Sequence, residues 1–165
     1  MALSQSMLAS EMQAALDALT APSAPSAEQA QAQAFGNYFK DAQHNAVFIL
    51  PGPVDSLAVP AMTAAMTFTI GTPATAAAVL TAGYTAFWGA IVASPAAFWP
   101  AAGVVTPAVG LATLAVALAA VFPVNNAPSI TKAQAAANLA AVIHPSAGLT
   151  GSALIGAGPA FAPIL

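Results

Sequence analysis

Apolar residues recur at the spacing of an α-helix near the start of the chain. Between residues 3 and 19 they fall on one face, and Glu11 and Asp17 lie mostly on the other. The apolar positions are Leu3, Met7, Leu8, Met12, Ala15, Leu16 and Leu19. This pattern predicts an amphipathic N-terminal helix within residues 1–20, packed on the chain's own core or on a neighbouring subunit.

A second amphipathic segment follows a short linker. The linker, residues 21–26, contains two prolines, which deny a helix its backbone hydrogen bonds. Ser26 can cap a new helix, and Glu28 in the first turn suits the positive end of the helix dipole. We therefore predict a helix from Ala27 to about residue 45, inside a unit of helix and turn that covers residues 27–55.

Two short stretches have the character of β-strands. Residues 46–50 form an apolar run closed by Pro51-Gly52-Pro53, which predicts a short strand or an extended crossing. Residues 66–70, Met-Thr-Phe-Thr-Ile, alternate apolar and polar side chains, as strands do. The alanines and methionines around residues 66–70 favour a helix instead, and both alternatives stay open.

The segment between these two stretches predicts a short helix over residues 54–67. Asp55 or Ser56 can supply its N-terminal cap. Pro60 limits this helix unless the proline lies in the first turn.

The middle of the chain, residues 56–131, contains no Asp, Glu, Lys or Arg. Pro73 to Ser94 predicts a helix, because proline suits its first position and Pro95 stops it. No side of this helix is polar, so it should be buried all round. Ala101 to Phe122 predicts a second helix that Pro107 either begins or kinks. Together the two form a long uncharged helical hairpin.

The last unit, residues 132–165, should hold one more helix. Pro123 to Pro128 predicts a turn, Ser129 offers a cap, and an alanine-rich helix should run to Ile143. His144-Pro145 ends it. The rest of the chain, from Gly148, is rich in glycine and proline yet apolar, which predicts an irregular tail docked in a groove on a neighbour.

These elements predict a mainly α-helical, alanine-rich chain, and its composition is unusual for water. Hydrophobic residues make up 59% of the 165 residues and charged residues 4%. Soluble domains carry about 25% charged residues. Something other than water, lipid or other subunits, should therefore cover much of the surface.

The charges that remain exclude several partners. The net charge is −3, with only two cations and no Arg. Nucleic-acid binding needs several Lys or Arg to displace counterions, and anionic lipid heads need a basic patch, so neither is expected. The chain has no Cys, which excludes disulfides and thiolate chemistry. The first residues lack a basic region, so no cleaved secretory signal is expected.

No residue pattern points to catalysis. There is no nucleophile elbow, phosphate loop or paired carboxylates, so we expect no enzyme activity, cofactor, metal or small-molecule substrate. Asp41 and His44 share one helix face at a spacing that suits a metal, but two ligands do not make a site. We interpret His44 as a solvated helix end and His144 as a partner of a helix dipole.

Two functions fit this chain. In the first it is a structural subunit of a large assembly, such as a virion-like particle or an injection or secretion device. Its partners are then copies of itself and other subunits. In the second it is a membrane protein that spans the bilayer twice, like a pore, a holin or a pilin. The scarcity of Lys and Arg beside the hairpin favours assembly. A hybrid would expose the hairpin to lipid only after oligomerising. The cellular compartment stays open.

Large apolar side chains are the candidates for contacts with subunits or lipid. They are Leu80, Tyr84, Phe87, Trp88, Ile91, Phe98, Trp99, Leu111, Leu114, Leu118, Phe122 and Phe161. Four aromatic residues, Tyr84, Trp88, Phe98 and Trp99, either form a belt at a membrane interface or fill space among alanine-rich helices. Two short stretches, Phe35–Lys40 and Thr85–Ala90, resemble small structural proteins of phage tails and injection particles. The resemblance covers too little of the chain to carry a function.

Overall fold

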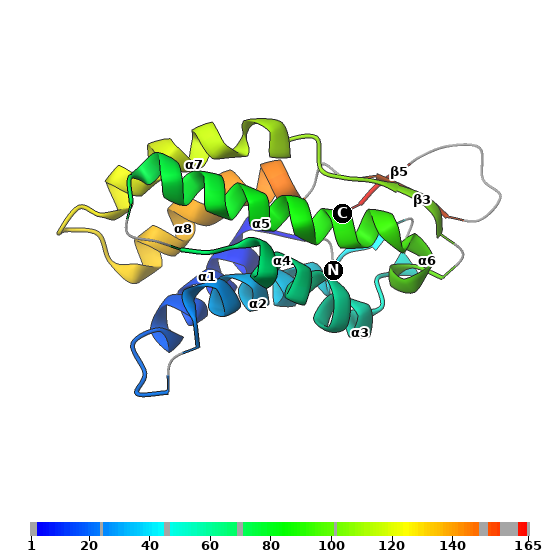
Figure 1. Ribbon diagram of the computed structural model, residues 1–165, viewed down its shortest axis with the longest axis horizontal. Helices are drawn as coiled ribbons and strands as arrows, with labels where there is room; N and C mark the ends of the chain where they lie inside the picture. The colour runs from blue at the N-terminus through cyan, green and yellow to red at the C-terminus, as the bar shows by residue number, and fades with distance from the viewer. Residues whose placement is uncertain are drawn as a thin grey trace.

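Helices dominate the computed structural model, which describes residues 3–23, 25–44, 47–68, 71–100, 102–148, 152–155 and 162–164. In Figure 1, α5 runs through the middle of the molecule, with α1 and α2 below it and α7 above it. The helices are α1 (Gln5–Ala18), α2 (Ala27–Phe39), α3 (Pro51–Pro53), α4 (Val59–Ala65), α5 (Pro73–Ala93), α6 (Pro95–Phe98), α7 (Leu111–Asn125) and α8 (Lys132–Ile143). Two π-helical turns, η1 (Val54–Ala58) and η2 (His144–Gly148), complete the helical part. The prediction of a mainly α fold is confirmed.

Local capping chemistry sets the starts of the first two helices. The Ser4 hydroxyl accepts a hydrogen bond from the Met7 N–H, and the Ser26 hydroxyl accepts one from the Gln29 N–H. Both helices lie where the sequence predicts them, although α2 ends at Phe39, earlier than expected. The chain there turns into β1 (Gln43–His44), which pairs antiparallel with β2 (Val47–Phe48). The strand predicted over 46–50 is therefore confirmed at Val47–Phe48, and residue 46 lies outside the described residues.

The helix predicted over 54–67 begins earlier and contains a π-turn. Leu50 occupies the N-cap of α3 without a side-chain hydrogen bond, so the predicted cap at Asp55 or Ser56 is wrong. Pro60 has no N–H, and its ring would clash with the carbonyl four residues back in a regular helix. The wider turn of η1 directly before α4 relieves this clash.

The strand predicted over 66–70 is absent from its described part, residues 66–68. The Phe68 N–H donates to Glu28 Oε1 at 2.9 Å, so a side chain takes the group that a strand partner would use. Residues 69–70 lie outside the described part of the chain.

The first arm of the predicted hairpin is confirmed as α5, a 21-residue helix that Thr72 caps and Pro73 begins. The second arm is shorter than predicted. Residues 102–106 form a strand, β3 (Ala102–Thr106), and helix α7 begins only at Leu111. Pro100 and Pro107 flank a run of β-branched residues here, which favours extended backbone. α5 and α7 run antiparallel and pack on each other (Figure 1).

Two boundaries near the end of α7 also differ from the prediction. The helix continues through Pro123 to Asn125, so the turn begins later than expected. Pro123 is exposed and lies in the last helical turn, where its missing N–H breaks only one hydrogen bond. Helix α8 is capped by Thr131 instead of Ser129, because Thr131 and Gln134 form a reciprocal capping box.

The tail is less irregular than its composition suggests. β4 (Ser152–Ile155) pairs antiparallel with β3, and β5 (Ala162–Pro163) pairs with β4. Ile164 is buried in the chain's own core. The described residues of the tail therefore pack on their own chain.

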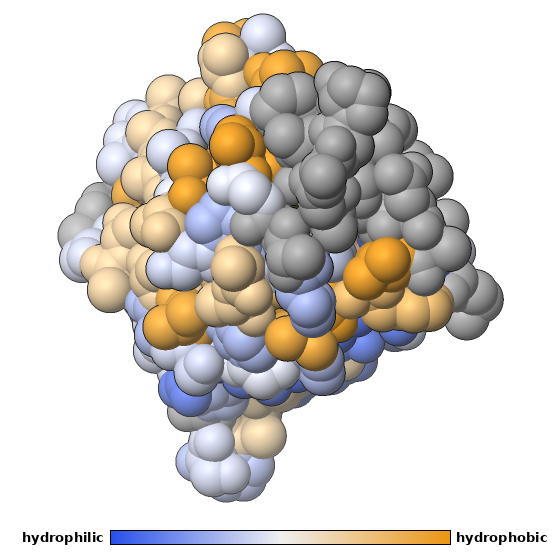
Figure 2. All heavy atoms as spheres, turned by 90° about the vertical axis from the view of Figure 1, so that its right-hand side faces the viewer, coloured by the Kyte–Doolittle hydropathy of each residue, from blue (hydrophilic) through white to orange (hydrophobic). Residues whose placement is uncertain are grey.

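Charged and uncharged residues separate between the two sides of the fold. The seven charged residues lie in or next to α1, α2, η1 and α8, and none lies in α5 or α7. Figure 2 shows the end of the molecule at the right of Figure 1, where the most hydrophilic groups lie in the lower half. The α1–α2 side is thus the polar side of this fold.

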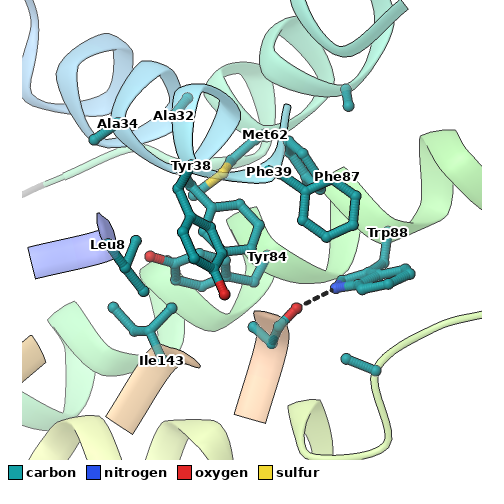
Figure 3. Packing of buried hydrophobic residues seen from close by; sticks show 14 of the residues in the cluster. Leu8, Ala32, Ala34, Tyr38, Phe39, Met62, Tyr84, Phe87, Trp88 and Ile143 are labelled. Carbon is teal, nitrogen blue, oxygen red and sulfur yellow. Dashed lines mark hydrogen bonds between the residues drawn. The ribbon is translucent and has the colours of Figure 1, made fainter. Parts of the chain in front are cut away.

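Aromatic rings from α2 and α5 form the centre of the core. Phe35 meets Tyr84 edge-on, with ring centroids 4.7 Å apart, and meets Phe87 in the same way at 4.9 Å. Figure 3 shows Tyr38 and Phe39 of α2 directed toward Tyr84, Phe87 and Trp88 of α5. α1 covers this core with Leu8 and Met12 and packs on α2 and α8. Of the two alternatives for α1, the structure places it on the chain's own core.

Candidate functional site

Most of the side chains predicted at subunit or lipid contacts lie inside the protein. Nine of the twelve are buried in the chain's own core: Leu80, Tyr84, Phe87, Trp88, Ile91, Phe98, Trp99, Leu114 and Leu118. Leu111 and Phe122 are partly buried against the core, and Phe161 lies outside the described residues. The largest apolar side chains gain most from leaving water, so they fill the core first. The four aromatics considered as a membrane belt are all in the core.

A smaller and uncharged set of residues remains on the outside of α5 and α7. We call it the α5–α7 surface. It comprises Thr75, Ala78, Ala82, Thr85, Gly89, Val92, Val109, Ala112, Val116, Ala120 and Val124, all of them exposed. Val109 and Val116 are the most exposed of its valines, at 76% and 77%. Such apolar groups in water favour contact with another apolar surface.

The α5–α7 surface contains a shallow hollow of about 420 Å³. On one side are Thr85, Gly89 and Val92 of α5, and on the other are residues 107–109, 111 and 112 at the start of α7. A side chain added at Gly89 would meet no atom within 4 Å. The two helices therefore present one continuous, open surface that could accept the side chains of a partner.

Helix α5 has a second property that bears on function. Among the described helices it is the one that is long and apolar enough to cross a membrane, judged by length and composition alone. The core helix of a water-soluble protein passes the same test. In this structure 39% of its most apolar window is buried.

A second hollow lies on the polar side, between α1 and α2, and has a volume of about 240 Å³. Its polar groups already pair with each other, since Asn37 Nδ2 donates to Glu11 Oε2 at 3.0 Å. In the described part of the chain, no three His, Asp or Glu side chains gather closely enough to hold a metal ion. Asp41 and His44 do not share a helix face as predicted, because α2 ends at Phe39 and His44 belongs to β1.

A cluster of polar contacts surrounds η2 at the edge of the core, and we call it the η2 cluster. His144 Nδ1 lies 2.5 Å from the Tyr38 hydroxyl, and Trp88 Nε1 donates to the Ala147 carbonyl at 2.8 Å. The second bond is dashed in Figure 3. His144 also ends α8, as the sequence predicts, but its ring pairs with Tyr38. Sequence reasoning missed this pair, because the two residues are 106 positions apart.

Burial changes the protonation of both members of this pair. It raises the pKa of the Tyr38 hydroxyl, which therefore stays protonated and can donate. It lowers the pKa of His144, which therefore stays neutral and can accept at Nδ1. At neutral pH the Tyr38 O–H can therefore donate to Nδ1 of the neutral imidazole tautomer that carries its hydrogen on Nε2.

Acidification below pH 6.5 should destabilise the fold through His144. The pKa of the folded imidazole lies below its ordinary value of 6.5, so in this range the unfolded chain binds more protons. The free energy of unfolding therefore rises with pH, and this contribution is lost as pH falls through the folded pKa. Urea midpoints measured from about pH 7.5 to about pH 5 should fall for the native chain and stay flatter for His144→Asn.

The two carboxylates whose pKa is lowered in the fold, Glu28 and Asp55, titrate outside the range of this measurement. The pKa of Glu28 is lowered by the Phe68 N–H and that of Asp55 by Lys40. Their contributions are lost only as pH falls below their ordinary values, 4.5 and 3.8. An equal slope in the native chain and the His144→Asn variant would contradict the assignment to His144.

The two buried tryptophans differ in hydrogen bonding and give a matched pair of variants. Trp88 donates to Ala147, whereas Trp99 Nε1 is buried with no partner among the described residues. Trp88→Phe should lower the free energy of unfolding by about 1–3 kcal/mol more than Trp99→Phe, because it leaves a carbonyl unpaired. Urea denaturation followed by far-UV circular dichroism measures both. Equal losses would show that the Trp88 bond contributes nothing net.

Comparison of the chain with protein-family models, with curated proteins and with solved structures finds no match.

Proposed function

We propose that the chain is a structural subunit that assembles with copies of itself through the α5–α7 surface, as in a virion-like or injection particle. The observation that carries this proposal is the exposure of Val109 and Val116 on a surface without any charge. Interfaces between subunits are depleted of charged residues at their centres. The polar α1–α2 side would remain in water.

The small residues of the α5–α7 surface support close helix packing. Ala78, Ala82 and Gly89 on α5 and Ala112 on α7 leave little side chain between the backbone and a partner. Helices with small residues at the contact approach at the short end of the usual range of about 8–10 Å. A helix of a second copy, carrying a residue such as Val116, could then fill the hollow over Gly89.

Membrane insertion is the second candidate, and the length and composition of α5 favour it. Insertion would require α5 to leave the core. Its Tyr84 would lose the hydrogen bond from Gln31 Nε2, which is 2.7 Å long, and Trp88 would lose its bond to Ala147. Unpaired polar groups are expensive in lipid, so these bonds favour the assembly proposal.

The mass of the purified chain in detergent-free buffer tests the proposal. Light scattering should give particles several times heavier than the 16.1 kDa subunit. Val116→Asp should shift the mass toward one subunit, because it places a charge in the contact. Gln13→Asp adds the same charge on the exposed face of α1 and should leave the mass unchanged.

Three other outcomes would count against self-assembly. A monomer at tens of micromolar would overturn it, and so would an unchanged mass for Val116→Asp. Recovery of the chain only from the membrane fraction with detergent would favour insertion instead.

A further inference from the structure

We propose that His144 is an acid-sensitive latch for the α5–α7 surface. Protonation of its imidazole would remove the acceptor of the Tyr38 hydroxyl proton, loosen η2 and weaken self-association. This inference rests on the proposed function, and it adds a control over the same surface. It follows from the position of η2, which begins at His144 and whose Ser146 lies against Gly110, directly before α7.

The first step is the loss of a hydrogen-bond acceptor. A neutral imidazole with its hydrogen on Nε2 accepts the Tyr38 proton at Nδ1, whereas a protonated imidazole carries hydrogen on both nitrogens and can only donate. Tyr38 is 1% exposed, so its hydroxyl cannot turn to water. Among the described residues no other group accepts from it, so protonation leaves a buried donor unpaired.

No carboxylate in the described part of the chain forms an ion pair with His144. Among the described elements, four contact η2 or His144: α2, α5, α7 and α8. α7 contains no titratable residue, and the only one in α8 is Lys132 at its far end. α2 offers Tyr38 at the contact and Glu28 in its first turn, which instead accepts from the Phe68 N–H. Trp88 of α5 reaches η2 with an uncharged indole.

The second step transmits the change to the surface. A Cβ atom at Gly110 would lie 2.5 Å from Ser146 Cα and 2.6 Å from its carbonyl oxygen, so the two backbones are already in contact. A Cβ atom at Gly148 would overlap the Tyr38 hydroxyl. η2 therefore lies between Tyr38 on one side and Gly110 on the other, and a shift of η2 toward α7 would displace Gly110.

Gly110 lies directly beside the hollow in the α5–α7 surface. The residues on either side of it, Val109 and Leu111, both line that hollow. A contact path thus runs from the His144 imidazole through η2 to the surface that we propose for assembly. A small displacement there changes the fit of a partner, because packed interfaces tolerate little deformation.

The test compares particle mass at about pH 7.5 and about pH 5.5, on either side of the ordinary imidazole pKa. The native chain should lose mass at the lower pH, falling several-fold toward 16.1 kDa. His144→Asn should keep its mass at both values, because the Asn side-chain oxygen can accept near the place of Nδ1 and does not titrate. His44→Asn, at the other histidine of the chain, should respond to acid like the native protein.

The outcomes separate this inference from the proposed function. If the native chain assembles but keeps its mass at the lower pH, the latch is overturned and assembly stands. The latch is also overturned, with assembly intact, if His144→Asn loses mass as the native chain does. If the native chain is a monomer at both pH values, the assembly proposal is overturned, and the His144 latch is overturned with it. The His144 titration followed by NMR then shows whether the Tyr38 pair itself responds to acid.

Discussion

Phe35→Ala should lower the free energy of unfolding by about 3–5 kcal/mol, as expected for removal of a large buried aromatic side chain. Phe35 is completely buried and contacts four other rings, those of Tyr38, Phe39, Tyr84 and Phe87. Truncation removes its own burial and leaves a cavity that these four rings must close. Edge-to-face ring contacts are lost as well.

The matched control for this variant is Phe48→Ala. Phe48 is 51% exposed in the short strand β2, so its truncation should change the free energy of unfolding by less than about 1 kcal/mol. Urea denaturation followed by circular dichroism gives both values. Similar losses in the two variants would mean that the ring cluster between α2 and α5 is not the centre of stability.

Leu114→Asp should abolish folding. Leu114 is completely buried on the core side of α7, which has no cation anywhere along its length to pair with a carboxylate. A carboxylate placed there would either lose its hydration or force its own protonation, and both cost several kcal/mol. That is a large share of the roughly 5–15 kcal/mol that stabilises a whole domain.

Val116→Asp, two residues further along the same helix, separates the core from the surface. Val116 is 77% exposed, so the variant should remain folded, with a free energy of unfolding within about 0.5 kcal/mol of the native value. Circular dichroism should show a helical native spectrum for Val116→Asp and an unfolded one for Leu114→Asp. If Leu114→Asp folds, then Leu114 does not pack in the core and α7 is oriented differently from the packing described above.

Local signals in the sequence predict the helices well. Ser26 with Glu28, and Pro73 with Pro95, act within a few residues of the helix ends they define, so their effect is readable without a fold. The strand β3 could not be found in this way. Its partner β4 begins more than 45 residues later, and the local preference of residues 102–106 for extended backbone does not reveal that pairing.

The candidate surface is harder to predict than the helices. Periodicity shows that Leu114 and Leu118 share a face of α7, but it does not show whether that face meets the chain's own core or another subunit. The structure shows the core. The exposed α5–α7 surface instead consists of alanine, glycine, threonine and valine, whose small side chains give weak patterns. The η2 cluster joins residues of α2, α5 and η2, and no local motif marks it.

The packing of α1 on α8 has a consequence for how the chain folds during its synthesis. Asp17 of α1 pairs with Lys132 of α8 across 115 positions, and the two helices lie against each other. α1 leaves the ribosome first, yet this partner is translated near the end of the chain. Because translation adds about 5–20 residues per second, the apolar face of α1 stays without its contact to α8 for several seconds or more. Nascent chains in that interval are targets for chaperones, and arresting translation before residue 132 should yield a chain that binds them and resists compaction.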